Sequence, residues 1–270
     1  MSAPGKTDRS RRTRAGRIAR GLTGLAVFLL AFEALGRAGL VSRDYLPPAS
    51  TILVRAAEQL AEPHFLSSVG ATIAAWAVGL LVATVVGVPL GLLLGSVPGV
   101  NVAAGAIVEF LRPIPSVALI PLAGLLLGSG LEMKATMIVY AALWPVLFNT
   151  IYGMAETDPV AKETLRTFGF SRLAVLWRVD LPSAAPFIAT GVRLASAIAL
   201  ILAISVEMLN GVGSGLGMYI SEARTGTNSA VTVLACTFWA GIIGLVLNGL
   251  FVAVDRRVFA WHRAKTGAAA

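Results

Sequence analysis

Long stretches without a charged side chain are the feature that most constrains this chain of 270 residues. No Asp, Glu, Lys or Arg occurs in residues 65–108, a run of 44 residues. A helix needs about 20 apolar residues to cross the hydrocarbon core of a bilayer, so this run fits two crossings with a turn near 96–101. Only 13% of the residues are charged, against about 25% in an ordinary soluble domain, which argues against a soluble globular fold.

The remaining apolar runs extend the pattern to six transmembrane helices and an all-α, polytopic membrane fold. Charge-free runs of 19, 21 and 30 residues cover 113–131, 135–155 and 225–254, and two further runs are interrupted only by isolated charges. The predicted spans are 20–41, 67–95, 101–127, 135–155, 184–209 and 231–254. Residues 18–270 are therefore expected to form a single transmembrane domain.

A basic tail, residues 1–17, precedes the first apolar run. Seven Lys and Arg residues lie from Lys6 to Arg20. A signal peptide has a shorter apolar core and a small-residue cleavage site, whereas this run of about 20 residues contains Glu33 and Arg37. We expect a retained first span in which Glu33 and Arg37 form a local pair.

The distribution of basic residues predicts the orientation. With the N-terminus in the cytoplasm, six alternating spans place 15 Lys and Arg residues inside and five outside. Cytoplasmic segments are enriched in these residues, so both termini and the loop 156–182 are predicted to lie inside. The same distribution accounts for the net charge of +8 without a nucleic-acid partner, and none is expected.

The loop 156–182 carries the signals of a short first helix. Asp158 is a good N-cap, and Pro159 suits the first helical position. Gly169 is a typical helix-ending residue, so a helix is predicted over 159–168.

A second short helix follows in the same loop. Ser171 can cap a helix over 172–179, which Pro182 is expected to close. Two short helices joined at a glycine should bend sharply. In a cytoplasmic loop, such a rigid joint can transmit force between a soluble partner and two spans.

The same segment resembles the EAA loop of the inner-membrane permease subunits of binding-protein-dependent ABC importers. The family pattern is Glu-Ala-Ala, three residues, Gly, nine residues, and Ile-x-Leu-Pro. The matching residues are Glu163, Gly169, Leu181 and Pro182, while Thr164, Leu165 and Val179 replace the two alanines and the isoleucine.

The resemblance implies a type I ABC importer permease fold over roughly residues 30–255. It implies an assembly in the cell inner membrane with a second permease subunit, as a homodimer, with separate cytoplasmic ATPase subunits and with an external solute-binding protein. The residues that it assigns to ATPase coupling are Glu163, Leu165, Arg166, Phe168, Gly169, Leu181 and Pro182.

Two further segments resemble the permease subgroup for nitrate, taurine, aliphatic sulfonates and pyrimidine precursors of thiamine. They read Leu-Arg-Pro-Ile-Pro at 111–115 and Glu-Met-Leu-Asn-Gly-Val-Gly-Ser-Gly-Leu-Gly at 207–217. At 127–130 the chain reads Leu-Gly-Ser-Gly, where the subgroup often has an aromatic residue before the first glycine. The resemblance implies a small anionic solute, such as a sulfonate, taurine or nitrate, with a thiamine-type pyrimidine precursor as the alternative.

The chain carries no sequence pattern for ATP hydrolysis or other catalysis. A phosphate-binding loop requires Gly-x-x-x-x-Gly-Lys-Ser/Thr, and that string does not occur. Ser-His-Asp order, zinc-ligand spacing and paired cytoplasmic carboxylates are not found, so no catalytic residue, cofactor or metal is expected. The energy for transport is therefore expected to come from another chain. The competing hypotheses are a secondary transporter with its own ion-coupling site and a membrane-embedded scaffold or enzyme.

Charged residues inside the predicted spans are functional candidates, because a charge in the hydrocarbon core is costly. Glu109 and Arg193 each lie about nine residues into spans of the same direction, so both are expected ~13 Å deep and able to pair. Arg112 lies one turn beyond Glu109 on the same face. These residues form either a structural clamp or a polar lining for an anionic substrate. Glu207 is expected to bracket the glycine-rich outer loop.

A stripe of small residues runs along the second predicted span. Gly87, Gly91 and Gly95 recur at four-residue spacing. Such stripes let helices approach closely. The sequence leaves open whether this glycine stripe packs inside one subunit or between subunits.

Overall fold

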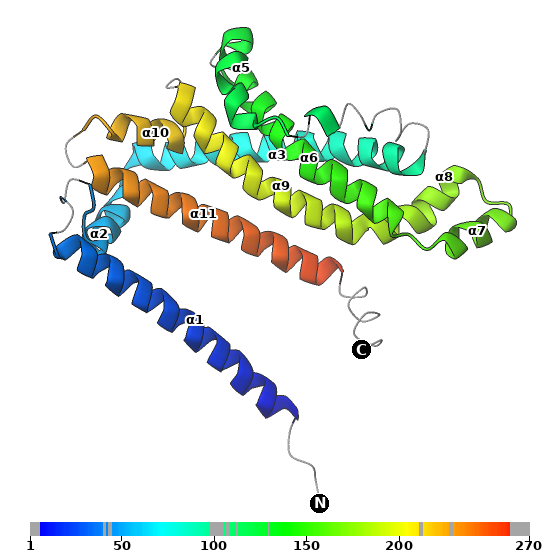
Figure 1. Ribbon diagram of the computed structural model, residues 1–270, viewed down its shortest axis with the longest axis horizontal. Helices are drawn as coiled ribbons and strands as arrows, with labels where there is room; N and C mark the ends of the chain where they lie inside the picture. Colours follow the sequence, from blue (N-terminus) through cyan, green and yellow to red (C-terminus); the bar gives the residue numbers. More distant parts are fainter. Residues whose placement is uncertain are drawn as a thin grey trace, which may run out of the picture. The chain divides into compact units, whose positions relative to one another are not determined.

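The computed structural model describes residues 6–39, 42, 45–97, 105, 109–111, 113–128, 130–210, 213–226 and 229–259. All regular elements in these ranges are helices, and η1 is a 3-10 helix and η2 a π-helical turn. In chain order they are α1 (Lys6–Arg37), α2 (Ala49–Gln59), α3 (Pro63–Ser96), η1 (Ser116–Leu119), α5 (Ile120–Leu127), α6 (Leu131–Ala155), α7 (Pro159–Thr167), α8 (Arg172–Val175), η2 (Leu176–Asp180), α9 (Leu181–Asn210), α10 (Leu216–Ala223) and α11 (Ser229–Val258) (Figure 1).

Five helical stretches in the described ranges are long and apolar enough to cross a membrane. They are Ala19–Arg37 within α1, α3, α6, Arg172–Leu209 and α11. Five of the six predicted spans are therefore confirmed as apolar helices. Their ends are displaced by at most four residues, except that the stretch predicted over 184–209 begins at Arg172.

The prediction of one continuous helix over 101–127 is wrong. Residues 113–115 are not helical, and only the shorter apolar helix Ser116–Leu127 follows them. Pro113 and Pro115 have no backbone N–H to donate, and each disfavours helical backbone at the residue before it. The apolar run predicted burial in the membrane, but its prolines break the helix.

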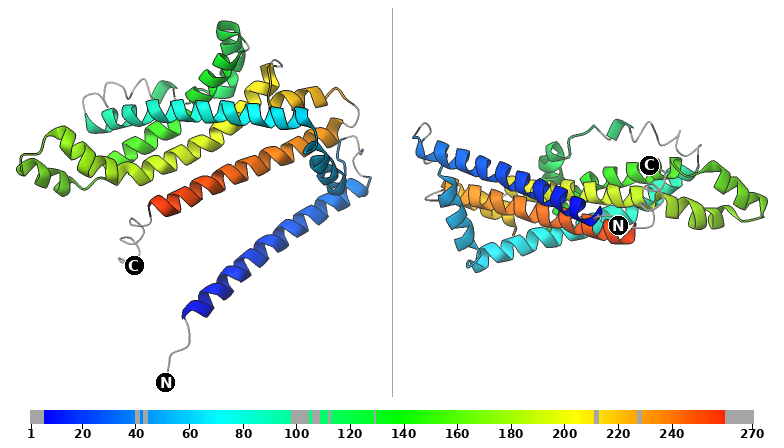
Figure 2. Two further views of the ribbon diagram at one scale, coloured as in Figure 1. Left: turned by 180° about the vertical axis from the view of Figure 1, so that it is seen from behind. Right: turned by 90° about the horizontal axis from the view of Figure 1, so that it is seen from below.

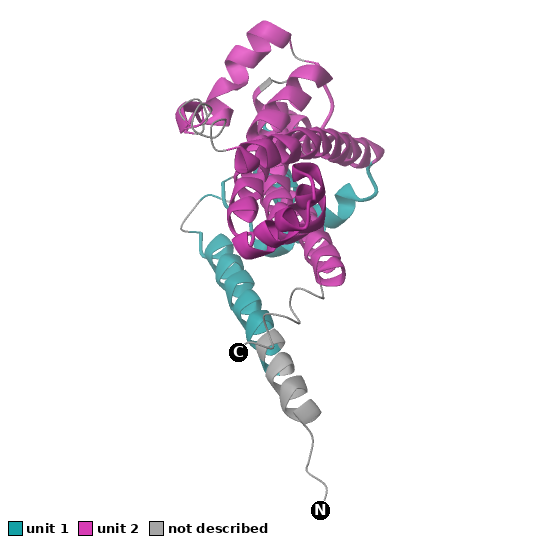
Figure 3. Ribbon diagram, turned by 90° about the vertical axis from the view of Figure 1, so that its right-hand side faces the viewer, with its two compact units in different colours: residues 1–62, 223–238 teal, residues 63–222, 239–270 magenta. Residues whose placement is uncertain are grey.

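The chain divides into two compact units, residues 1–62 with 223–238 and residues 63–222 with 239–270 (Figure 3). In the first unit, the predicted pair of Glu33 and Arg37 is confirmed at 2.6 Å. The Glu33 carboxylate also accepts hydrogen bonds from the backbone N–H and the hydroxyl of Ser50, both at 2.9 Å. Because the first N–H groups of a helix lack partners within it, Glu33 of α1 caps the start of α2.

The second unit is built around α3, α6 and α9, which lie side by side (Figures 1 and 2). The Trp76 indole N–H donates to the backbone carbonyl of Ser196 at 2.9 Å, which satisfies its polar edge inside the apolar core. That core contains many small side chains, and its buried residues are Ala75, Trp76, Leu80, Ala83, Ile138, Ala142, Val146, Ala195, Ala199, Leu200 and Ala203.

The glycine stripe of α3 packs against α6 within the subunit. A Cβ added to each of the three glycines would come too close to a side chain of α6. The distance would be 3.0 Å from Gly87 to Val146, 2.5 Å from Gly91 to Thr150 and 2.7 Å from Gly95 to Met154. Cβ atoms do not tolerate such approaches, so glycine permits the close contact of the two helices. The stripe therefore serves packing inside the subunit.

The same contacts give the directions of the helices. Residue numbers rise together along α3 and α6, so these helices run parallel. Gly153 of α6 faces Ala184 and Gly191 of α9 faces Pro145, so α9 runs antiparallel to α6. Since α3 and α6 run parallel, the chain between them has to return from one end of the bundle to the other.

Candidate coupling elbow and polar sites in the helix bundle

The elbow, defined as residues 158–182, starts each of its short helices with a side-chain cap. An oxygen of Asp158 accepts a hydrogen bond from the backbone N–H of Val160 at 2.9 Å, at the start of α7. The hydroxyl of Ser171 accepts one from the N–H of Ala174 at 3.2 Å, at the start of α8. Each cap satisfies an N–H group that has no partner inside the helix. Both predicted helix starts are confirmed.

A left-handed glycine turn ends α7. Gly169 has a φ of +81°. The N–H of Phe170 donates to the carbonyl of Leu165 at 3.1 Å, and that of Gly169 donates to Arg166 at 2.9 Å. This pair of hydrogen bonds is the Schellman closing motif, in which glycine is favoured because it has no Cβ to clash. The predicted bend at Gly169 is confirmed.

The sequence predicted that Pro182 closes the second short helix, and this prediction is wrong. α8 continues through η2 into α9, so Arg172–Leu209 is one helical stretch. In a regular α-helix, the ring of Pro182 would press on the carbonyl of Arg178, four residues earlier. The wider π-turn η2 directly before α9 relieves this clash and lets the helix continue.

An ion pair that the sequence did not predict fastens α7 to η2, the turn that leads into α9. The ammonium of Lys162 in α7 lies 2.8 Å from an oxygen of Asp180 in η2, and it donates to the carbonyl of Met154 at 3.4 Å. The lysine and aspartate side chains are 22% and 11% exposed. The elbow is thereby tied both to the last turn of α6 and to the start of α9.

The predicted coupling residues lie on different faces of the elbow. Glu163 and Phe168 are exposed, and Leu165 is half-buried. Leu181 and Pro182 form the first turn of α9. The exposed acidic and aromatic side chains leave the outer face of α7 free for a partner.

Arg166 faces a pocket instead. This elbow pocket has a volume of about 370 Å³, and its charged lining residues are Lys162, Arg166, Arg172 and Asp180. The ends of α3 and α6 form its apolar wall, through Gly95, Ser96, Val97 and Met154. This pocket could not be predicted from the sequence, because its walls come from separate helical segments: the ends of α3 and α6, and α7, α8 and η2.

A buried polar cluster centred on Glu207 lies at the opposite end of the second unit. The carboxylate accepts hydrogen bonds from the Thr72 hydroxyl at 2.8 Å and from the backbone N–H of Gly217 at 3.0 Å. Its other oxygen lies 2.8 Å from the ammonium of Lys134, which also donates to the carbonyl of Ser214 at 2.9 Å. Glu207 thus holds the glycine-rich loop before α10 against α3 and α6.

Close approach explains the glycines of this loop. A Cβ on Gly215, whose φ is +151°, would meet the carboxylate of Glu207. One on Gly217 would meet the backbone carbonyl of Ile204. Lys134 is one of the five basic residues that the predicted orientation places outside the membrane, yet it is only 9% exposed because the loop folds over it.

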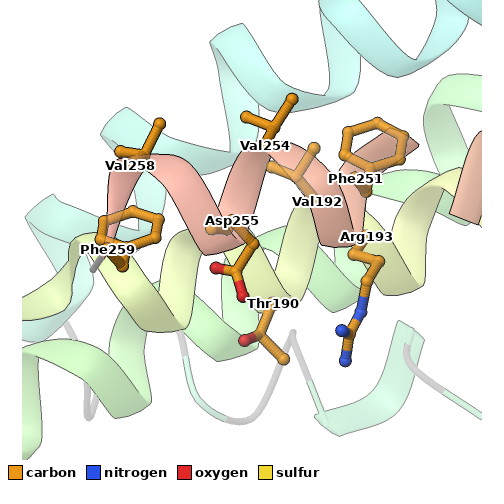
Figure 4. Close-up of a pocket in the computed structure, with 9 residues that line it drawn as sticks. Thr190, Val192, Arg193, Phe251, Val254, Asp255, Val258 and Phe259 are labelled. Atoms are coloured by element: carbon orange, nitrogen blue, oxygen red, sulfur yellow. The ribbon is translucent and has the colours of Figure 1, made fainter. Parts of the chain in front are cut away.

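Arg193, near the middle of α9, borders two pockets between α9 and α11. The first, of about 270 Å³, is lined by Thr190, Arg193 and Asp255 together with apolar side chains (Figure 4). The second, of about 260 Å³, includes Arg193, Ser196 and Asn248 in its lining. In Figure 4 the polar ends of Thr190, Arg193 and Asp255 point to the same side of the two helices. Within the described ranges, the Arg193 guanidinium has no ion pair or hydrogen bond.

The predicted pair of Glu109 and Arg193 is not present among the described residues. Glu109 is exposed, and Arg112 lies outside the described residues. The expected pairing rested on equal depth, counted in residues from the start of each span. Equal depth alone does not bring two side chains together, because the rotation of each helix about its axis decides which face a residue lies on.

Metal binding is not indicated by the side chains. In the part of the chain that the structure describes, no group of three or more His, Cys, Asp or Glu residues is placed to hold a metal ion. The two buried carboxylates Glu207 and Asp180 are each compensated by a lysine instead.

Known proteins similar to this chain are transport permeases. Residues 87–260 match the family model for the binding-protein-dependent transport system inner membrane component. The chain is 35% identical over 186 residues to an ABC transporter permease protein of Methanocaldococcus jannaschii, covering 68% of this chain and 69% of that one. It is 28% identical over 243 residues to the taurine transport system permease protein TauC of Escherichia coli, covering 88% of each chain.

A solved structure shares the fold. The inward-facing MetNI methionine ABC transporter matches with a TM-score of 0.63 and 21% identity, over 72% of this chain and 95% of that chain. At this identity the likeness concerns the fold, and it confirms the type I importer permease fold that the EAA loop implied. The match over most of the chain therefore establishes that it belongs to the family of binding-protein-dependent transport system inner membrane components.

Proposed function

We propose that this chain is the permease subunit of an ATP-driven importer for a small anionic solute. Curated relatives are named for nitrate, taurine and aliphatic sulfonates. The solute class that this supports is a small molecule with a nitrate or sulfonate group. A thiamine-type pyrimidine precursor is the alternative within the same family.

The observation that carries the proposal is a continuous helix that joins the elbow to both polar sites. The stretch Arg172–Leu209 begins in the elbow, carries Arg193 near its middle and reaches Glu207 near its far end. The pair of Lys162 and Asp180 fastens α7 to the base of this helix. A push on α7 is thereby passed to the helix that borders the α9–α11 pockets.

A separate ATPase supplies that push in this proposal. It docks on the exposed face of α7, where Glu163 and Phe168 lie, and Gly169 sets the angle between α7 and α8. Closure of the ATPase subunits then moves the elbow and, through Leu181 and Pro182, tilts α9. ATP hydrolysis belongs to the partner because this chain has no phosphate-binding loop.

The elbow end of the second unit is proposed to face the cytoplasm. The first pocket joins the early turns of α9 to the last turns of α11, so the elbow and the end of α11 lie at the same end. The basic residues described at this end are Lys162, Arg166, Arg172, Arg178, Arg256 and Arg257. The enrichment of Lys and Arg in cytoplasmic segments supports a protein of the cell inner membrane with both termini inside. Its further partners are a second copy of the chain and an external solute-binding protein.

Arg193 is proposed to contact the anion during transport. An unpaired guanidinium inside a membrane span is costly unless it faces a water-filled cavity or a counter-ion. Its planar group of N–H donors suits the oxygens of a nitrate or a sulfonate. The structural clamp remains the competing role, because both roles place a cation inside the bundle.

Uptake by proteoliposomes that hold the complete transporter tests the proposal. With the external binding protein and labelled taurine, nitrate or an alkanesulfonate, we expect accumulation that depends on internal ATP. Arg193→Gln is expected to lower uptake about tenfold or more, the effect of roughly 1.4 kcal/mol. Arg20→Gln, the same change at an exposed position of α1, is the matched control and should leave uptake near wild type.

Two outcomes would contradict parts of the proposal. Uptake driven by an ion gradient without any ATPase would favour a secondary transporter. Wild-type uptake by Arg193→Gln, with ATP dependence intact, would leave the importer function standing and assign Arg193 to structure.

A further inference from the structure

We propose that the elbow pocket binds the phosphate group of an anionic membrane lipid. This site lies apart from the proposed solute path and does not depend on which solute is transported. Its walls come from the ends of α3 and α6 and from α7, α8 and η2. The argument rests on the charges in the pocket, its level along the helices and the side chains around it.

The elbow pocket has an excess of positive charge. Three cations, Lys162, Arg166 and Arg172, and one carboxylate, Asp180, line it. Asp180 is already used by Lys162 at 2.8 Å. Among the described residues, the guanidinium groups of Arg166 and Arg172 have neither an ion pair nor a hydrogen bond. Two guanidinium groups therefore remain without a counter-charge on the same pocket.

Helix ends do not account for these two arginines. The carbonyl ends of α3 and α6 carry partial negative charge, which attracts cations. Lys162 serves this purpose, since it donates to the carbonyl of Met154. Arg166 and Arg172 make no such hydrogen bond in the described structure. Guanidinium groups bind phosphate oxygens through paired N–H donors, so a phosphate group fits the unsatisfied donors.

The level of the pocket along the bundle points to a lipid. α3 has 34 residues and is about 51 Å long, whereas the hydrocarbon core is about 30 Å thick. A helix of this length that is centred on the core extends about 10 Å beyond it at each end, which puts the last turn, with Gly95 and Ser96, at the level of the lipid headgroups. Basic pockets beside membrane helices at this level bind anionic headgroups.

Exposed apolar side chains on the helical stretch that borders the pocket support the same occupant. Leu173 of α8, which lines the pocket, is 64% exposed. Trp177, four residues further along the same stretch, is 63% exposed, and tryptophan is enriched where membrane helices meet the headgroups. A soluble phosphate compound would meet the same arginines, but it would leave these apolar groups in water.

An acidic segment of the ATPase is the competing occupant. Glu163 and Phe168, the exposed residues proposed for ATPase docking, do not line the elbow pocket. Lys162 and Arg166, one turn apart on α7, do line it. The pocket and the proposed ATPase surface therefore use different faces of α7.

Native mass spectrometry of the full-length chain in complex with its ATPase subunits tests the proposal. The complex is purified with equal amounts of phosphatidylglycerol, which is anionic, and phosphatidylcholine, which is zwitterionic. We expect the wild type to retain phosphatidylglycerol preferentially. The double variant Arg166→Gln/Arg172→Gln should retain about tenfold less, because it removes two headgroup-binding cations. It leaves the pair of Lys162 and Asp180 in place to hold the elbow.

Two variants serve as controls. Arg178→Gln removes the same charge from η2, but the Arg178 guanidinium lies over the ring of Phe170 at 4.8 Å and does not line the pocket. Lipid retention should be unchanged in that variant. Arg166→Lys/Arg172→Lys keeps the charge and should keep most of the lipid, which separates lost charge from a misfolded elbow.

Three results would overturn the proposal. Equal phosphatidylglycerol retention by wild type and by Arg166→Gln/Arg172→Gln would show that the pocket does not hold the lipid. Displacement of the lipid by millimolar inorganic phosphate would assign the pocket to a soluble phosphate compound. Unchanged lipid retention with loss of the ATPase subunits from the double variant would assign it to the ATPase.

Discussion

Two lysine–carboxylate pairs of equal length hold opposite ends of the second unit, and they differ in burial. Lys134 and Glu207 lie 2.8 Å apart, with side chains 11% and 1% exposed. Lys162 and Asp180 also lie 2.8 Å apart, but their side chains are 22% and 11% exposed. Glu207 accepts two more hydrogen bonds, from Thr72 and from the backbone of the glycine-rich loop. The far-end pair is part of a larger network, whereas the elbow pair has one further hydrogen bond, from Lys162 to the carbonyl of Met154.

This difference indicates that the two ends have different mechanical roles. A buried charge that loses its partner costs several kcal/mol, because no water replaces the lost contact. A pair with one partly exposed partner costs less to open, since water solvates that partner. The far-end pair therefore fixes the start of α10 more firmly than the elbow pair fastens α7.

Removal of one partner of the far-end pair should have the largest effect. Lys134→Met leaves Glu207 buried without a counter-charge, so we expect the free energy of unfolding to fall by about 3–5 kcal/mol. Thermal unfolding of the purified chain measures this loss. Lys134→Met/Glu207→Gln should recover part of it. A double variant as unstable as the sum of the two single variants would contradict the pairing.

An added methyl group at Gly217, in the first turn of α10, should have the next largest effect. In Gly217→Ala, the new Cβ would meet the backbone carbonyl of Ile204, which cannot move aside alone. We expect a loss of about 1–3 kcal/mol, the usual range for overpacking. Gly241→Ala in α11 is the matched control, because its Cβ meets nothing within 4 Å. Equal stability of the two variants would show that the loop is held loosely.

Loss of the elbow pair should cost less and act locally. Asp180→Asn is expected to lower stability by about 1 kcal/mol, because the charge left unpaired is that of Lys162, whose side chain is 22% exposed and keeps contact with water. Hydrogen exchange should become faster in α7 and stay unchanged in the core of α6. A loss as large as that of Lys134→Met would remove the distinction between the two pairs.

The smallest effect is expected at an exposed pair near the far end. His64 and Glu222 lie 3.5 Å apart, with side chains 65% and 50% exposed. Glu222→Gln should change stability by less than about 0.5 kcal/mol in the same unfolding experiment. A larger change would mean that position at the far end, rather than burial, decides the strength of a pair.

The sequence predictions that the structure confirms depend on residues that are close together in the sequence. Long apolar runs, two of them interrupted by isolated charges, predicted five of the long helices, because a span depends on length and composition. Asp158, Gly169 and Ser171 predicted the starts and the bend of the elbow, because capping depends on a few adjacent residues. The glycine stripe predicted a close helix contact for the same reason.

Contacts between distant segments could not be predicted from the sequence. The partner of Lys134 is Glu207, and its burial depends on a loop that folds over both residues. The partner of Lys162 is Asp180, and the two side chains meet only because α7 folds back toward η2. The failed pairing of Glu109 with Arg193 has the same origin, since equal depth along two helices does not decide which of their faces meet. Helix register, which decides all three pairs, is set by packing across the whole bundle.

The central claim is that a stiff elbow passes ATPase motion to α9. Solute uptake per ATP hydrolysed, measured on the reconstituted complex with Gly169→Val, tests it most directly. Gly169 has a φ of +81°, where a side chain with a Cβ costs about 1–2 kcal/mol, so the elbow angle should change while the spans stay folded. With Gly241→Ala as the control, we expect ATP hydrolysis to persist and uptake per ATP to fall about tenfold or more, an effect of roughly 1.4 kcal/mol. Wild-type uptake per ATP in Gly169→Val would show that the elbow is only a connector and would contradict the account.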